Sequence, residues 1–194
     1  MNAPVVRYML ALTIGCIVSF TAVTTTRAYD ANHRWSTNTA SFSYASSWPA
    51  GSWRDRASDA AESWNNVSTS SWRWTYPSTP SQGDLRLENI DGSGGTFGTT
   101  TITYNGGFVT SFRLRVDREE LWNVGAIPRN TEVDLESVVV HELGHGAWAD
   151  HTDGTGPDCT ITARPTMCAF IPRGTSFMRS LEQDDRDGIS FVYP

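Results

Sequence analysis

The 194-residue sequence contains no lysine, and it has only three cysteines and four histidines. Its positive charge comes from arginine alone, and the formal net charge at pH 7 is −6. Proteins that bind nucleic acids usually carry a basic patch or stripe facing the phosphates. The acidic balance and the missing lysines therefore argue against a nucleic-acid partner.

Long apolar runs are also scarce. Residues 9–23 form one such run, but it contains three hydroxyl side chains and is shorter than the roughly 20 residues that a membrane span requires. Arg7 precedes the run and Ala28 ends the threonine-rich stretch after it, which is typical of a secretory signal peptide covering residues 1–28. A transmembrane anchor and a lipoprotein anchor at Cys16 are the alternatives. We expect a secreted, extracellular protein without stable membrane association.

Residues 29–194 are long enough for one domain with its own core, and we expect a single domain and a monomer. Cys16 would leave with the signal peptide, so that only Cys159 and Cys168 remain. Two cysteines in a secreted protein usually form a disulfide. A cysteine–zinc site is the alternative, but it would lack further ligands.

Local patterns predict a strand, a helix and then four more strands. Residues 39–45 alternate as a half-buried strand does. The helix begins at Ser52, with Asp55 as a capping acid and an apolar stripe that includes Trp53 and Trp64. The further strand candidates lie between breaks rich in proline, serine and glycine, at residues 71–76, 84–90, 99–104 and 108–116.

Six of the eight tryptophans fall between Trp35 and Trp74. An exposed cluster of this density could form a platform for sugars, whereas a buried cluster would be core packing. Trp53 and Trp64 already lie on the apolar stripe of the predicted helix. Their position favours core packing.

The chemistry of the chain is concentrated in residues 141–151. His141 and His145 are four residues apart, so a helix places both imidazoles on one face, where they can bind one zinc ion. Glu142 is adjacent, and its carboxylate can accept a proton from a zinc-bound water without being a ligand itself. We predict that Glu142 is the general base of a hydrolase.

The third predicted zinc ligand is His151, which a continuing helix would carry to the wrong side. The helix must therefore end before this residue. Zinc proteases with the extended motif H-E-x-x-H-x-x-G-x-x-H have a glycine at the bend, but here that position is Trp148. Either Trp148 has a strained backbone or the bend falls at Gly146. Asp150 or Asp153 is the alternative third ligand.

From about Trp35 to its C-terminus, the chain resembles a matrixin, one of the metzincin zinc endopeptidases. The similar segments are residues 133–138 before the histidine motif, the turn at Met167, and residues 181–189, in the family's order. The resemblance implies an α+β, zincin-like fold: a twisted, mostly parallel five-stranded sheet with an antiparallel edge strand, two long helices and a C-terminal helix. Residues 29–194 would form the metzincin catalytic domain.

Around the zinc, the resemblance implies an apolar floor at Met167 and a specificity-pocket wall at Phe170, Ile171 and Pro172. The resemblance also assigns two aspartates of the last helix, Asp184 and Asp185, to bracing the methionine turn. Local signals add that Asp134 caps the active-site helix, and that Ser180 and Gln183 form a capping box for a last helix running to about Val192.

A glycine-rich loop and a nearby acidic segment resemble the calcium site of matrixins. Carboxylate and carbonyl oxygens from two neighbouring segments suit calcium. A polar turn beside a solvated acidic run is the alternative. The expected calcium-binding residues are Asp91, Gly92, Gly94, Thr96, Asp117 and Glu120.

Together these features predict a secreted, zinc-dependent endopeptidase with catalytic Zn²⁺ and structural Ca²⁺. A protein or peptide substrate would lie extended and pair with the edge strand around residues 97–104. A secreted carbohydrate-binding or structural zinc protein that uses the tryptophan-rich half is the alternative. Glu142 argues against it, because a closed structural zinc site needs no general base.

Overall fold

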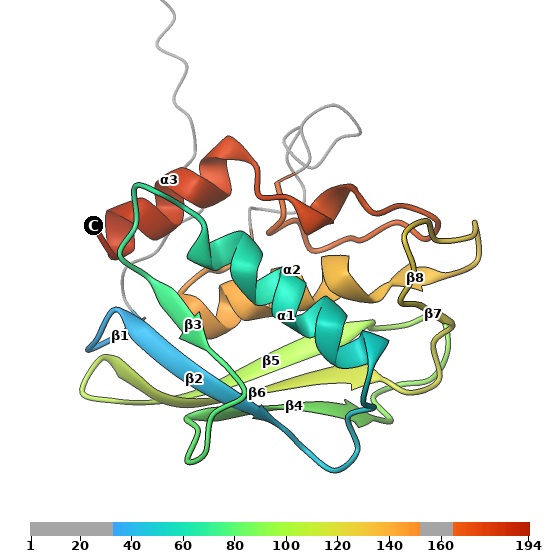
Figure 1. Ribbon diagram of the computed structural model, residues 1–194, viewed down its shortest axis with the longest axis horizontal. Helices are drawn as coiled ribbons and strands as arrows, with labels where there is room; N and C mark the ends of the chain where they lie inside the picture. The colour runs from blue at the N-terminus through green and yellow to red at the C-terminus, as the bar shows by residue number, and fades with distance from the viewer. Residues whose placement is uncertain (1–32, 152–164) are drawn as a thin grey trace, which may run out of the picture.

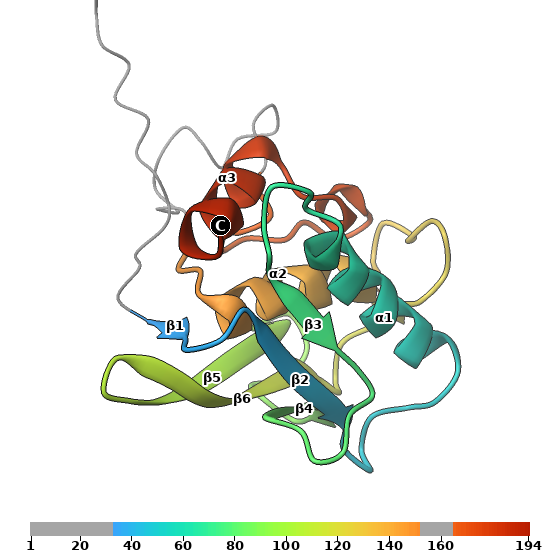
Figure 2. The same ribbon diagram turned by 60° about the vertical axis from the view of Figure 1, so that its left-hand side comes forward.

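The computed structural model describes residues 33–151 and 165–194. Within these residues, a twisted sheet forms one layer, and the helices α1, α2 and α3 lie together on one of its faces (Figures 1 and 2). No helix of the described part has the length and apolar character needed to cross a membrane. The two layers meet in one hydrophobic core.

The sheet is mostly parallel, as predicted. β4 (Gly83–Glu88) lies in its centre, between β2 (Thr39–Tyr44) and β6 (Phe108–Asp117), and β2 also pairs with β3 (Arg73–Thr75). On the other side of β6 runs β5 (Gly98–Asn105), the one antiparallel strand of this sheet within the described residues. The sixth member, β1 (Arg34–Trp35), pairs with the start of β6. β1 was not predicted, because two residues are too short to show periodicity.

The register explains which side chains form the core. Along β6, Val109, Phe112, Leu114 and Val116 are buried. Arg113 and Arg115, which alternate with the last three of them, are exposed and partly buried, respectively. This alternation is the period of a strand with one covered face. The predicted strand boundaries were within two residues of those observed, because the alternation is local.

Helix α1 (Ser52–Asn65) begins at the predicted residue, although Gly51 precedes it and no side chain caps it. Asp55 lies in the first turn. The helix buries three alanines and Trp64, whose indole N–H donates to the carbonyl oxygen of Val140 in α2 at 2.9 Å. The small alanine side chains let the two helices approach closely, and the indole fixes their register.

Helix α2 (Leu135–Ala147) is the central helix of the core. All of its residues except His145 are buried. Its N-cap is Asp134, as predicted, with the carboxylate accepting from the backbone N–H of Ser137 at 3.0 Å. Arg179 of the short 3₁₀ helix η2 (Phe177–Arg179) makes a bidentate ion pair with the same carboxylate, at 2.9 and 2.5 Å. The start of α2 is therefore fixed by a local cap and a distant ion pair.

The last helix, α3 (Gln183–Val192), ends where predicted but is capped differently. The capping box is formed by Glu182 and Asp185, so the prediction of Ser180 and Gln183 was wrong. Glu182 and Asp185 do not have the usual Ser/Thr-x-x-Glu/Gln pattern, so this capping box is visible only in the structure. A second small sheet, β7 (Trp122–Asn123) with β8 (Val133–Asp134), was not predicted for the same reason as β1.

All eight tryptophans pack in the core or against it. Trp53 and Trp122 are partly buried, and the other six are at most 5% exposed. The interpretation of the tryptophan-rich half as core packing is confirmed. No tryptophan stands exposed to form a platform for sugars.

Candidate metal centre and active-site cleft

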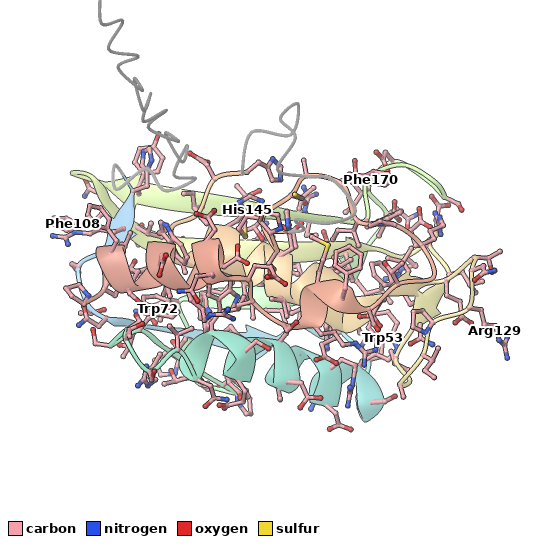
Figure 3. The ribbon with its side chains drawn as sticks, turned by 90° about the horizontal axis from the view of Figure 1, so that it is seen from above. Trp53, Trp72, Phe108, Arg129, His145 and Phe170 are labelled. Atoms are coloured by element: carbon pink, nitrogen blue, oxygen red, sulfur yellow. The ribbon has the colours of Figure 1, made fainter. Side chains whose placement is uncertain are left out.

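Three histidines converge in front of the C-terminal half of α2. His141 and His145 project from successive turns of the helix, and His151 follows the helix end (Figure 3 labels His145). Their Nε2 atoms lie 3.1, 3.1 and 3.2 Å from one another. Tetrahedral zinc with Zn–N bonds near 2.0–2.1 Å places its nitrogen ligands roughly 3.3 Å apart. The three nitrogens therefore fit one zinc ion.

Within the described residues, this is the one group of three or more histidine, cysteine or acidic side chains whose ligand atoms all lie within 4.8 Å of one another. His151 rather than Asp150 completes it. Asp153, the other alternative third ligand, lies outside the described residues.

The hydrogen bonds of two histidines fix the tautomer that a metal needs. The Nδ1–H of His141 donates to the carbonyl oxygen of Thr166, and that of His145 to the carbonyl oxygen of Ala149, each at 2.7 Å. A carbonyl can only accept, so the ring proton must be on Nδ1 and the lone pair on Nε2. Burial and the neighbouring His145 also lower the pKa of His141 to about 3, which keeps the ring neutral.

The turn containing Met167 packs directly beneath the histidines. A Cβ atom at Gly144 would lie only 2.4 Å from the Met167 sulfur and 2.9 Å from the Trp64 ring. Glycine between the two helical histidines is therefore needed for this close approach. From the other side, the buried Asp185 carboxylate accepts from the backbone N–H of Thr166 at 3.0 Å, so α3 supports the turn.

Glu142 is 4% exposed, and it borders the cleft next to the histidines. Burial raises the pKa of its carboxyl group to about 7. Its Oε2 atom accepts no hydrogen bond within the described part of the chain. A carboxylate with a pKa near neutrality and a free oxygen is suited to accept and return a proton.

The edge strand β5 lies close against Glu142. A Cβ atom at Gly98 would lie 2.8 Å from Val138 and 3.0 Å from the Glu142 side chain. Two residues on, the Thr100 hydroxyl donates to the backbone carbonyl of Glu142 at 2.9 Å. The missing side chain and this hydrogen bond keep the strand and the helix together at the cleft.

Two cavities flank the contact between β5 and α2, and both are bordered by Gly98, Glu142 and His151. One, of about 450 Å³, extends past Ile102 and Trp148. The other, of about 310 Å³, extends toward Phe170 and Ile171, on the side where Figure 3 labels Phe170. Of the three residues predicted to form a pocket wall, Phe170 and Ile171 line this cavity, whereas Pro172 is not among its lining residues.

Neither bend predicted for the helix end is present. Gly146 is within α2, and Trp148, the first residue beyond it, has φ −177°. In the described residues no residue other than glycine has a positive φ. The hypothesis of a strained Trp148 was wrong, because its backbone is in an extended region that any residue adopts. Its indole is 5% exposed and meets the Trp64 ring edge-on at 5.3 Å.

The residues predicted to bind calcium lie around one loop, but their carboxylates accept from N–H and O–H groups rather than converging on one point. Asp117 is fully buried and accepts from two loop amides, each at 3.2 Å. Glu120 accepts from a third loop amide and pairs with Arg173, both at 2.5 Å. The Asp91 carboxylate accepts from the Thr96 hydroxyl at 2.8 Å. The amides of Asp91, Gly92 and Gly94 are the loop donors.

Cys168 is buried directly after Met167. Its predicted partner, Cys159, lies outside the described residues. The disulfide therefore stays a prediction.

Several residues of this site were missed by the sequence analysis. Thr166 and Ala149 contribute backbone carbonyls, which have no signature in the sequence. Gly98 and Thr100 matter because β5 packs against α2, a contact between distant segments. Gly144 could have been found, since a glycine between two helical histidines is unusual in a helix interior.

Residues 21–194 match the family model described as Matrixin. Over 104 residues the chain is 35% identical to matrix metalloproteinase-25 of Mus musculus, a match that covers 54% of this chain and 15% of that protein. Over 108 residues it is 33% identical to metalloendoproteinase 1 of Glycine max, covering 54% of this chain and 30% of that protein. The matched part is thus less than a third of the length of either relative.

Proposed function

Because the chain belongs to the matrixin family, we propose that it is a zinc-dependent endopeptidase that cleaves extended protein or peptide substrates. The observation that carries this proposal is the group of three histidine Nε2 atoms 3.1–3.2 Å apart with Glu142 beside them in the cleft. His141, His145 and His151 would hold the ion, and Glu142 would be the catalytic acid–base residue.

Zinc bound here would supply a water with a pKa lowered to roughly 7 and would polarise the scissile carbonyl. Glu142 would take the proton of the attacking water and return it to the leaving nitrogen. Its burial supports this role, because burial raises the pKa of the carboxyl group and so favours holding the proton until the leaving nitrogen takes it. The hydrogen bonds from His141 and His145 to backbone carbonyls would keep the ligands in one orientation.

The substrate would bind along β5. In the described residues one side of this strand pairs with β6 and the other has no partner strand. An extended peptide can add to such an edge through backbone hydrogen bonds. The cavities on either side of Glu142 would then receive substrate side chains on both sides of the scissile bond, with Phe170 and Ile171 lining one of them.

Three variants test the catalytic assignment. Glu142→Ala should retain zinc and lose nearly all peptide hydrolysis, because the general base is removed while the three ligands remain. His151→Ala should lower zinc content. Glu88→Ala is the matched control, since Glu88 borders neither cavity of the cleft. Substantial turnover by Glu142→Ala, measured on a peptide library with and without chelator, would overturn the proposal.

We also propose that the loop at residues 91–96 binds calcium. Asp117 is fully buried, and it forms no ion pair within the described residues. Arg173 supplies one positive charge, to Glu120. Although burial opposes this, backbone amides lower the pKa of Asp117, so its carboxylate is charged without a cationic side chain from the described residues beside it, and oxygen ligands favour calcium. A calcium ion would offset this charge with a small rearrangement of the carboxylates.

Calcium added at buffered free zinc should raise the melting temperature of the wild-type chain. A ligand present at a hundredfold excess over Kd stabilises the folded state by about 2.7 kcal/mol. Asp117→Asn should remove this response and leave zinc content unchanged. A wild-type melting temperature that does not respond to calcium would show that the loop is only a polar turn.

We expect residues 1–28 to be removed on secretion and the mature chain to be a monomer. N-terminal sequencing of the secreted protein should begin at residue 29. Light scattering should give the mass of one mature chain, and a dimer mass would contradict the monomer.

A further inference from the structure

The end of α2 is capped by side chains from distant parts of the chain. In a continuing helix, the amide of residue 150 would bond to the carbonyl of Gly146, and the amide of residue 151 to that of Ala147. In the structure, the indole N–H of Trp35 donates to the Gly146 carbonyl, and the hydroxyl of Tyr193 donates to the Ala147 carbonyl, each at 2.8 Å. Two of the three acceptors that continuation of the helix from residue 149 to residue 151 would use are therefore already bonded to side chains.

Tyr193 is held firmly in this position. It is 1% exposed, and its hydroxyl also accepts from the backbone N–H of Trp35 at 3.0 Å. Its ring packs on the Trp72 ring at 4.5 Å, and its carbonyl accepts from the backbone N–H of Ser71 at 2.9 Å. Figure 1 shows β1 and the C-terminus at the same end of the molecule, next to the end of α2. The first strand and the C-terminal residues thus meet there.

The place where α2 ends decides where His151 lies. A helix extended through residue 151 would turn about 240° between His145 and His151, which points the second ring away from the first. Instead, the amides of Trp148 and Ala149 both bond to the Gly144 carbonyl, at 3.0 and 2.9 Å. The chain then turns back, and the Nε2 atom of His151 comes within 3.1 Å of that of His145.

We infer that Trp35 and Tyr193 are positioning residues for the third zinc ligand: by capping Gly146 and Ala147 they end the active-site helix and direct His151 to the metal. In the extended histidine motif a glycine stands at the bend, but this chain has Trp148 there, with no positive φ. Side-chain donors from the two ends of the fold take over the task of ending the helix. Because His151 is a proposed ligand, this assignment rests on the proposed function.

The test is the zinc affinity of Tyr193→Phe, which removes the capping hydroxyl and keeps the ring. Loss of a group that orients a ligand weakens metal binding by about tenfold or more, so we expect the zinc Kd to rise about tenfold in a competition titration with a chromophoric chelator. Trp35→Phe, which removes the other donor, should raise it too. Tyr76→Phe is the matched control, because the Tyr76 hydroxyl bonds to α1, at Ser58 and Glu62.

A purely structural role predicts a different result. A variant that is less stable but still folded binds zinc with unchanged Kd, so Tyr193→Phe and Tyr76→Phe would both lower the melting temperature and leave the zinc Kd as in wild type. That outcome, for Tyr193→Phe and Trp35→Phe alike, would overturn the inference. Failure of the proposed function is distinguishable: either the wild-type chain would bind no zinc, or His151→Ala would leave its affinity unchanged.

Discussion

Replacing Trp148 by glycine tests how the active-site helix ends. The extended histidine motif has glycine at this position, so a strained Trp148 would make the substitution stabilising. The structure predicts the opposite sign. With φ −177°, the Trp148 backbone has no positive-φ strain for a glycine to relieve.

The expected loss follows from the contacts of the indole. Trp148 is 5% exposed and meets the Trp64 ring edge-on at 5.3 Å, next to the helix that carries the histidines. Truncating a buried tryptophan costs about 3–5 kcal/mol, and the greater freedom of glycine in the unfolded chain adds about 0.5–1 kcal/mol. Trp148→Gly should therefore lower the free energy of unfolding by roughly 4–6 kcal/mol.

Urea denaturation of the zinc-loaded chain measures this change. Trp148→Phe is the matched control. The indole N–H has no hydrogen-bond partner within the described residues, so phenylalanine loses only part of the buried area and should cost about 1–2 kcal/mol. Equal or greater stability of Trp148→Gly relative to wild type would refute this reasoning and support the hypothesis of a strained backbone at Trp148.

Three further predictions concern the same region. In the zinc-free chain, the contribution of Glu142 to stability should fall as pH rises from 4.5 to about 7, because the folded state raises the pKa of this carboxyl group. Relative to wild type, Glu142→Gln should therefore gain about 3 kcal/mol between pH 4 and pH 8, and parallel pH profiles of the two chains in urea would contradict this. Gly98→Ala places a methyl group 2.8 Å from Val138 and 3.0 Å from Glu142. It should therefore lower the free energy of unfolding by about 1–3 kcal/mol and lower kcat. Unchanged kcat and stability would show that the strand moves freely. Mass spectrometry of the secreted, unreduced protein should show Cys159 and Cys168 joined, a bridge that contributes about 2–4 kcal/mol; alkylation of both thiols in the native protein would count against it.

The sequence by itself determined the metal motif and most of the regular structure. His141 and His145 can be assigned to one metal because a spacing of four on a helix brings their rings together whatever surrounds them. The strands β2 to β6 and the helix α1 were predicted at nearly their observed positions, because alternation and apolar stripes are local properties. The role proposed for Glu142 beside the first histidine comes from the same local motif.

Only the tertiary structure decided how this motif is held. The carbonyls of Thr166 and Ala149 orient the histidines, and the donors that end α2 come from Trp35 and Tyr193, which are 158 residues apart. No local pattern indicates which distant side chain will reach a helix end, since that depends on how the sheet and helices pack. The local motif supplies two of the proposed metal ligands, and packing between distant segments places the third.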